Sequence, residues 1–183
     1  MKGKLKQWAI LFGGLIVAIG TTTATAQPNP NNSKFYCGDY NGTPATYVSG
    51  RRGPVPMIRW EDTSFPPPWT PQRRCQDVSA RFQGFYDNGQ LNYIKAGRLN
   101  HQSVLCITQT QPGECIPQGL LITLKPETDP QRTLERLLDF QVAGGGASIS
   151  LATKQQIFYT NGEAYLDMRK FLGEDEENDG PLW

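Results

Sequence analysis

Residues 64–82 read SFPPPWTPQRRCQDVSARF, and this stretch decides where the first helix begins. Thr70 is a suitable N-cap because its hydroxyl can accept a free backbone N–H. Pro71 suits the first helical position, where no N–H is needed and φ is already set. Apolar side chains then recur at spacings of three and four, at Cys75, Val78, Phe82 and Phe85. This stripe predicts an amphipathic helix that stops at Asp87-Asn88-Gly89.

Short strand patterns lie on both sides of this helix. They read FYCGDY, TPATYV and VPMIRW upstream, and LNYIKA, QSVLCITQ, GLLITLKP, SISLAT, QIFYT and EAYLDM downstream. Asn41-Gly42 and Asn161-Gly162 supply the positive φ angles of two-residue hairpin turns. Asp129-Pro130 caps a second helix, which carries Leu134, Leu137 and Leu138 on one face. Two amphipathic helices among seven or more strands predict an α+β domain with a largely antiparallel sheet of short strands.

The chain has four cysteines, Cys37, Cys75, Cys106 and Cys115. An even number of cysteines in an exported chain favours two disulfides. A zinc site is disfavoured because there is no C-x-x-C spacing and only one histidine; we expect no metal and no cofactor. Of the three connectivities we prefer Cys37–Cys75 and Cys106–Cys115, since the Pro-Gly turn in VLCITQTQPGECIP brings the ends of the smaller loop together. The sequence alone leaves the pairing open.

The first 26 residues have the three-part pattern of a secretory signal peptide. Lys2, Lys4 and Lys6 precede an apolar run of about 13 residues, and small residues end the segment. A membrane span needs about 20 apolar residues, so we expect cleavage after Ala26 and no transmembrane span afterwards. Residues 27–34 would be a loose lead-in and residues 35–172 a single domain. Export to the periplasm, the thylakoid lumen or the cell envelope is expected, with the exact compartment open.

The formal net charge of the whole chain is +1, and without residues 1–26, which hold three lysines and no acidic residue, it is about −2. Five acidic residues lie in residues 173–183, GEDEENDGPLW, which we call the acidic tail. The remaining body is near +3, far from the basic stripe of a nucleic-acid-binding domain. We expect the acidic tail to be a solvated, disordered end; the more specific alternative is a segment that docks onto a partner.

Catalytic patterns are sparse in this sequence. His101 lies in the polar turn RLNHQS, where an exposed surface residue is expected. Neither a G-x-S-x-G elbow nor an H-E-x-x-H pair is present. Glu61-Asp62 beside Trp60 is interpreted as a polar strand end, and Gly144-Gly145-Gly146, which lacks the lysine of a P-loop, as a linker. The sequence therefore favours a non-catalytic role over an enzyme.

Six arginines lie between Arg51 and Arg81, against three acidic residues. Arg73 and Arg74 occupy the first turn of the predicted helix, where the macrodipole disfavours cations. Such a placement indicates either an external anionic partner, or a bond to the acidic tail or to strand-end carboxylates. The candidate residues for contact with a partner are Arg51, Arg52, Trp69, Arg73 and Arg74.

Several short motifs occur along the chain in an order and spacing that can be compared with known families. They are F-Y-C near residue 35, G-x-V-P-M-I-x-W, T-P-Q-R-R-C-x-x-V-S-x-R-F, G-x-L-x-Y, V-L-C-I, and L-L-I-T-L-K-P before Asp-Pro. The set resembles the circadian oscillating protein family of cyanobacteria from about Phe35 to Phe140, and all four cysteines fall on family positions. The region after Gly144 and the acidic tail do not fit the family pattern. The resemblance implies an exported four-cysteine domain and brings no catalytic residue.

The leading hypothesis is a non-catalytic, disulfide-stapled module of the cyanobacterial cell envelope or thylakoid lumen. Its partner would be a protein or an anionic membrane surface, contacted by the arginine cluster and Trp69. The alternative is a small-ligand or glycan-binding domain that uses its aromatic side chains, Tyr40, Tyr47, Trp60 and Tyr93. A hydrolase that uses His101 or a carboxylate pair comes third.

Overall fold

The computed structural model of the chain describes residues 32–50, 53–143 and 157–174, without the side chains of residues 137–143. The first sheet has the order β1-β2-β3, and the second has the order β6-β5-β4-β8-β7. The strands of the first sheet are β1 (Phe35–Tyr40), β2 (Thr43–Gly50) and β3 (Gly53–Arg59). Those of the second are β4 (Tyr93–Leu99), β5 (Gln102–Thr108), β6 (Leu120–Thr123), β7 (Ile157–Thr160) and β8 (Glu163–Asp167). All neighbouring strands are antiparallel, which confirms the predicted α+β class.

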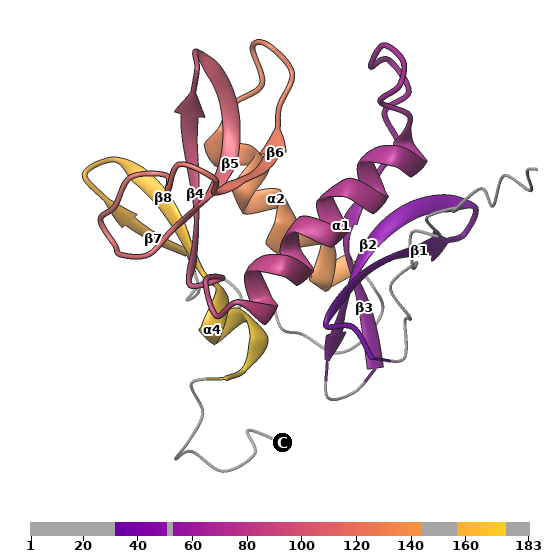
Figure 1. Ribbon diagram of the computed structural model, residues 1–183, viewed down its shortest axis with the longest axis horizontal. Coiled ribbons are helices and arrows are strands. Elements are labelled where there is room, and N and C mark those ends of the chain that lie inside the picture. The colour runs from indigo at the N-terminus through magenta and orange to yellow at the C-terminus, as the bar shows by residue number, and fades with distance from the viewer. Residues whose placement is uncertain (1–31, 51–52, 144–156, 175–183) are drawn as a thin grey trace, which may run out of the picture.

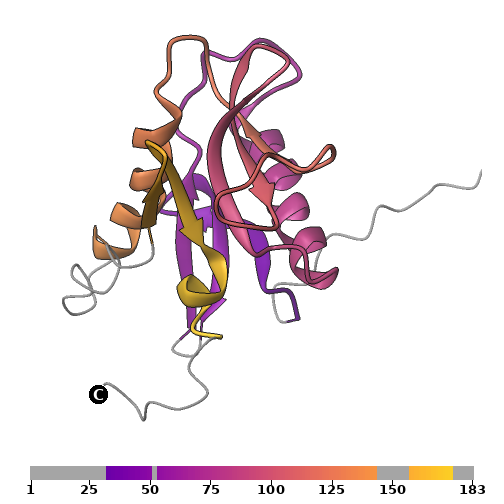
Figure 2. The same cartoon turned by 90° about the vertical axis from the view of Figure 1, so that its left-hand side faces the viewer.

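The helices are α1 (Pro71–Asp87), α2 (Pro130–Ala143) and α4 (Met168–Leu172). Figures 1 and 2 show α1 and α2 lying between the two sheets. Helix α1 contacts β1 and β2 on one side and β6 on the other, and α2 contacts β3 as well as β4 and β8. Each of these helices therefore joins one sheet to the other.

The core lies along these contacts. The rings of Phe35 on β1 and Phe82 on α1 are fully buried and stack with centroids 5.2 Å apart. The largest fully buried side chains of the second sheet are Ile94, Leu105, Ile107, Leu121, Tyr165 and Leu166. Between the first sheet and α1, buried donors find an acceptor: the indole N–H of Trp60 and the hydroxyl of Ser79 both donate to Thr46 Oγ1 at 3.0 Å.

The predicted start of α1 is confirmed in detail. Thr70 Oγ1 accepts the backbone N–H of Arg73 at 3.2 Å, and Pro71 is the first helical residue. The stripe of Cys75, Val78 and Phe82 is buried, and Phe85 packs against its edge. The helix ends at Asp87, and Gly89 follows with a φ of +64°.

Both Asn-Gly turns are also confirmed. Asn41 and Gly42 have φ angles of 51° and 83° between β1 and β2, and Asn161 and Gly162 have 54° and 80° between β7 and β8. The turn between β4 and β5 is shorter than expected. Leu99 of β4 already pairs with Gln102 of β5, so the turn consists of Asn100 and His101 alone, both with positive φ.

The last helix was not predicted from the sequence. EAYLDM was expected to be a strand through Met168, but β8 ends at Asp167. The Asp167 carboxylate accepts the backbone N–H groups of Arg169 and Lys170 at 3.1 Å each, so it caps α4. The expected strand SISLAT, the triglycine linker and the signal peptide lie outside the described residues, as do the side chains of Leu137 and Leu138.

Both preferred disulfides are confirmed. Cys37–Cys75 joins β1 to α1, and Cys106–Cys115 closes the loop after β5. Two disulfides fit an oxidising compartment. Among the described helices, none has the length and apolar character to cross a membrane.

Candidate functional site

A groove lies between α1, the loop of residues 60–70 and the end of β6. Its volume is about 560 Å³, within the range of protein ligand sites. Trp60, Phe65 and Trp69 from the loop give it an aromatic wall, and Ile122 and Leu124 give it an aliphatic one. The groove is therefore apolar over most of its lining.

The two tryptophans have different roles in this groove. Trp60 is 6% exposed, with its indole fixed by Thr46. Trp69 is 42% exposed, and among the described residues only Tyr159 is another exposed large hydrophobic side chain. An exposed tryptophan beside a groove is typical of an interaction site, because its large apolar area is left in water until something covers it.

Arg74 lies against the aromatic wall. Its guanidinium carbon is 4.2 Å from the ring centroid of Phe65 and 5.3 Å from that of Trp60, and its Nη2 donates to the backbone carbonyl of Asp62. In the described part of the chain, Arg74 Nε is the one buried side-chain polar atom without a hydrogen-bond partner. Burial lowers the pKa of Arg74, while the nearby Asp62 opposes this shift. The site thus contains a partly desolvated cation with one unused donor.

Lys125, just after β6, ties the loop to the strand. Its ammonium is 2.5 Å from the Asp62 carboxylate, donates to the Ser64 hydroxyl and lies 5.3 Å from the ring centroid of Phe65. The hydrogen bonds from Lys125 and Ser64 hold the pKa of Asp62 well below its usual range. Across the groove, Arg81 Nη1 donates to the backbone carbonyl of Leu121 at 2.8 Å.

The charge of the groove is positive. Its basic side chains are Arg74, Arg81 and Lys125, and its acidic one is Asp77, which pairs with Arg73 at 2.9 Å. Because the cations are braced by rings and backbone carbonyls, their positions are fixed before any ligand arrives. The groove can hold an apolar group with a carboxylate or another anion next to it.

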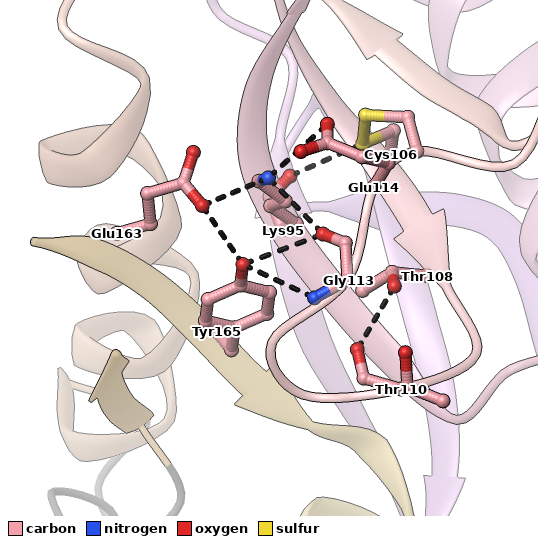
Figure 3. Close-up of a disulfide and its surroundings, with 9 residues drawn as sticks. Lys95, Cys106, Thr108, Thr110, Gly113, Glu114, Glu163 and Tyr165 are labelled. Carbon is pink, nitrogen blue, oxygen red and sulfur yellow. Dashed lines mark hydrogen bonds and ion pairs between the residues drawn. A yellow bond between two sulfur atoms is a disulfide. The ribbon is translucent and has the colours of Figure 1, made fainter. Parts of the chain in front are cut away.

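A second polar cluster lies elsewhere on the second sheet, centred on Lys95 of β4 (Figure 3). The Lys95 ammonium is 2.9 Å from the Glu163 carboxylate, 3.1 Å from the Gly113 carbonyl and 3.5 Å from the Glu114 carboxylate. The hydroxyl of Tyr165 donates to Glu163 at 2.9 Å. Cys106, which pairs with Lys95 across β4 and β5, holds the loop that carries Gly113 and Glu114 through its disulfide.

This cluster stabilises a buried cation. Burial alone would lower the pKa of Lys95, but the hydrogen bond from Lys95 to Glu163 and the surrounding negative charge raise it overall. The same bond lowers the pKa of Glu163. An ammonium has three donors, and the three acceptors around Lys95 match them. Lys95 therefore stays protonated at neutral pH and is no nucleophile or base.

The family of the chain follows from a comparison with family models. The model described as circadian oscillating protein COP23 matches residues 34–173. The chain belongs to this family. The COP23 match continues beyond Phe140 through β7, β8 and α4, so the resemblance visible in the sequence motifs ended too early. No curated protein and no solved structure matches the chain.

The structure brings together two of the five residues proposed to contact a partner. Trp69 and Arg74 both line the groove. Arg73 is exposed on the same helix and pairs with Asp77, and Arg51 and Arg52 lie outside the described residues. The locally unfavourable place of Arg74 in the first turn is thus offset by its contacts within the described structure.

The aromatic set proposed for a glycan is not gathered at the groove. Only Trp60 of this set lines it, while Tyr40 and Tyr47 belong to the first sheet and Tyr93 to the second. His101 is exposed at the turn after β4. The two carboxylates after β3 do not act as a pair: Glu61 binds Arg59 at 3.0 Å, whereas Asp62 binds Lys125.

Sequence reasoning missed Phe65 and Lys125 as groove residues, and it missed the Lys95 cluster; Arg81 was counted only as a member of the arginine cluster. Phe65 was visible as the apolar residue that begins the proline stretch. Lys125 follows an apolar strand directly and gave no signal of its own. Lys95 was the clearest missed signal, because it is a charged residue directly between the apolar residues Ile94 and Ala96.

Proposed function

We propose that the chain is a non-catalytic binding module that holds a segment of a partner protein in the groove. The supporting observation is that Trp69 and Phe65 lie beside the fixed charges of Arg74 and Lys125 in one concavity. Tryptophan and arginine are enriched among the residues that contribute most to protein interfaces. The complementary segment carries an aromatic or aliphatic side chain next to carboxylates.

The proposed place of action is an exported, oxidising compartment of a cyanobacterium. The two disulfides support it, and so does the N-terminal pattern that predicts cleavage after Ala26. Both the periplasm and the thylakoid lumen meet this condition. A protein segment is preferred over an anionic membrane surface because the aromatic side chains line a concavity, which a protruding chain fills better than a lipid surface.

A small acidic ligand is the second candidate. The volume of about 560 Å³ favours it, since such volumes are typical of sites that enclose small molecules. The groove would then take a molecule with an apolar ring and an anionic group, rather than a neutral glycan on the four aromatic residues first considered.

The first prediction tests the groove by capture. The mature, oxidised protein is immobilised and exposed to periplasmic and lumenal fractions, and retained proteins are quantified for wild type, Trp69→Ala and Lys125→Gln. We expect a partner retained by wild type to fall by roughly tenfold or more in Trp69→Ala, the size of an interface hot spot. Lys125→Gln keeps a hydrogen-bond donor and removes the charge. Its retention of the partner should therefore be lower than that of wild type at low salt, and this difference should shrink as added salt screens the charge of Lys125 in wild type.

The controls are Tyr159→Ala and Arg136→Gln, which remove an exposed aromatic and an exposed cation outside the groove. Both should retain the partner. Equal retention by all variants would contradict the proposal. A different outcome would replace the protein partner by a membrane surface. In that case wild type binds anionic vesicles at low salt, Trp69→Ala does not, and no protein is retained by either.

A further inference from the structure

The groove and the acidic tail have opposite charge and matching composition. Three basic side chains line the groove. Lys125 is paired with Asp62, and the one acidic residue of the lining, Asp77, is paired with Arg73, so a net positive charge remains from Arg74 and Arg81. The acidic tail has five carboxylates followed by Pro-Leu-Trp. It thus offers carboxylates next to an aliphatic and an aromatic side chain, which is the combination that the groove is built to accept.

The tail also starts within reach of the groove. Glu174, its last described residue, lies 3.8 Å from Lys34 Nζ, and the same ammonium lies 5.7 Å from the ring centroid of Tyr86 near the end of α1. Tyr86 and Pro71, the helical residue nearest to Trp69, are 15 positions apart on that helix, which is about 23 Å along its axis. Residues 175–183 span about 30 Å when extended. This length exceeds the axial distance from Tyr86 to the start of α1.

We propose that the acidic tail occupies the groove of its own molecule, with Trp183 against Trp69 and Phe65 and its carboxylates facing Lys125 and Arg81. A tethered segment has an effective concentration in the millimolar range, so even a weak contact competes with a partner in solution. The tail is then a built-in competitor that only a tighter or more concentrated partner displaces. This inference rests on the proposed function in taking the groove as the partner's binding site.

Photocrosslinking of the full mature, oxidised chain tests where the tail lies. Trp183 is replaced by p-benzoylphenylalanine, which keeps an aromatic side chain, and the crosslinked residues are identified by mass spectrometry. We expect crosslinks within the monomer to residues 60–70 and 122–126. Their yield should fall several-fold in Lys125→Gln and in about 0.5 M salt, because screening weakens contacts between exposed charges, and should be unchanged in Arg136→Gln.

Three results would overturn the inference: crosslinks scattered over other surfaces, no crosslinks, or crosslinks only in dimers. The last of these would assign the groove to the tail of a second copy. Persistence of the groove crosslinks at full yield in Lys125→Gln and at high salt would also contradict it, since the proposed contact depends on charge.

Charge reversal in the tail separates this inference from the proposed function. The double variant Glu176→Lys/Glu177→Lys should raise partner capture several-fold by freeing the groove. If capture depends on Trp69 but does not change in this variant, and no groove crosslinks form, the inference fails and the proposed function stands. If groove crosslinks form but no partner is retained by any variant, the proposed function fails and the inference stands.

Discussion

At the scale of a single residue, the fold offsets the cost of burying the Lys95 ammonium. Its side chain is 3% exposed, and an ammonium buried without partners would cost several kcal/mol. β8 supplies Glu163 and Tyr165, and the disulfide-closed loop supplies the Gly113 carbonyl. A buried cation in β4 is therefore retained because two separate segments, β8 and the disulfide-closed loop, converge on it.

We expect Glu163→Gln to lower the free energy of unfolding by about 1–3 kcal/mol at pH 7, the range for a hydrogen bond between charged groups. The loss should lie in the lower half of this range, because the Glu163 side chain is 43% exposed and solvent screens the pair. Urea unfolding of wild type and variant at pH 7 measures the difference. Glu127→Gln, at an exposed glutamate without a described ion pair, is the matched control and should change little.

The same pair predicts a pH dependence. Glu163 has a lowered pKa in the folded state, so its contribution to stability is complete above the unfolded value of 4.5. It is lost as the pH falls through the folded pKa, where the carboxylate becomes protonated. The difference between wild type and Glu163→Gln should therefore shrink as the pH falls below 4.5 and vanish once the pH is below the folded pKa. A difference that stays constant down to about pH 2 would show that the ion pair is not its cause.

At the scale of the element, α1 is positioned by its cap as well as by its apolar face. The prolines of residues 66–68 lead into Thr70, which accepts the Arg73 N–H, and the next residue, Arg74, extends back over Phe65. The helix start and the groove wall are thus made by the same ten or so residues. A change in the cap alters both stability and the presentation of Trp69.

Thr70→Ala is expected to lower the free energy of unfolding by about 1 kcal/mol, because one N–H at the helix start loses its acceptor. Chemical denaturation compared with Thr63→Ala gives the measurement, since Thr63 is an exposed threonine in the same loop. A similar loss in both variants would point to the loop composition rather than to the cap.

For the whole molecule, two sheets are held apart by two helices and joined through them. The disulfide Cys37–Cys75 connects the first sheet to α1 across 38 positions, whereas Cys106–Cys115 closes a loop of nine positions within the second sheet. A crosslink restricts the unfolded chain more when its loop is longer. The first disulfide is therefore expected to contribute more to the stability of the arrangement.

The loop-entropy relation gives about 4 kcal/mol for Cys37–Cys75 and about 3 kcal/mol for Cys106–Cys115. We expect Cys37→Ser/Cys75→Ser to lower the free energy of unfolding by the larger amount, and Cys106→Ser/Cys115→Ser by the smaller, in urea titrations without reductant. The opposite order would contradict this account and would assign the larger effect to the loop that covers Lys95.

Much of the fold follows from local patterns. Thr70-Pro71, the two Asn-Gly turns and the spacing of Cys75, Val78 and Phe82 each predicted the element that is observed. Helix α4 was missed because its start depends on one aspartate that caps the chain directly after a strand. Lys125 was also missed as part of the candidate site, since it gives no local signal of its own, whereas Arg81 was counted in the arginine cluster.

The sequence by itself determined the hairpin turns, the starts of α1 and α2 and the family, and it favoured the disulfide pairing that is observed. Each depends on the conformational preferences of neighbouring residues or on a set of motifs readable in order. Only the tertiary structure decided that Lys125 meets the loop of residues 60–70 and that Lys95 is buried beside Glu163. These contacts join residues more than 60 positions apart, and such contacts depend on how the sheets and helices pack rather than on any one segment.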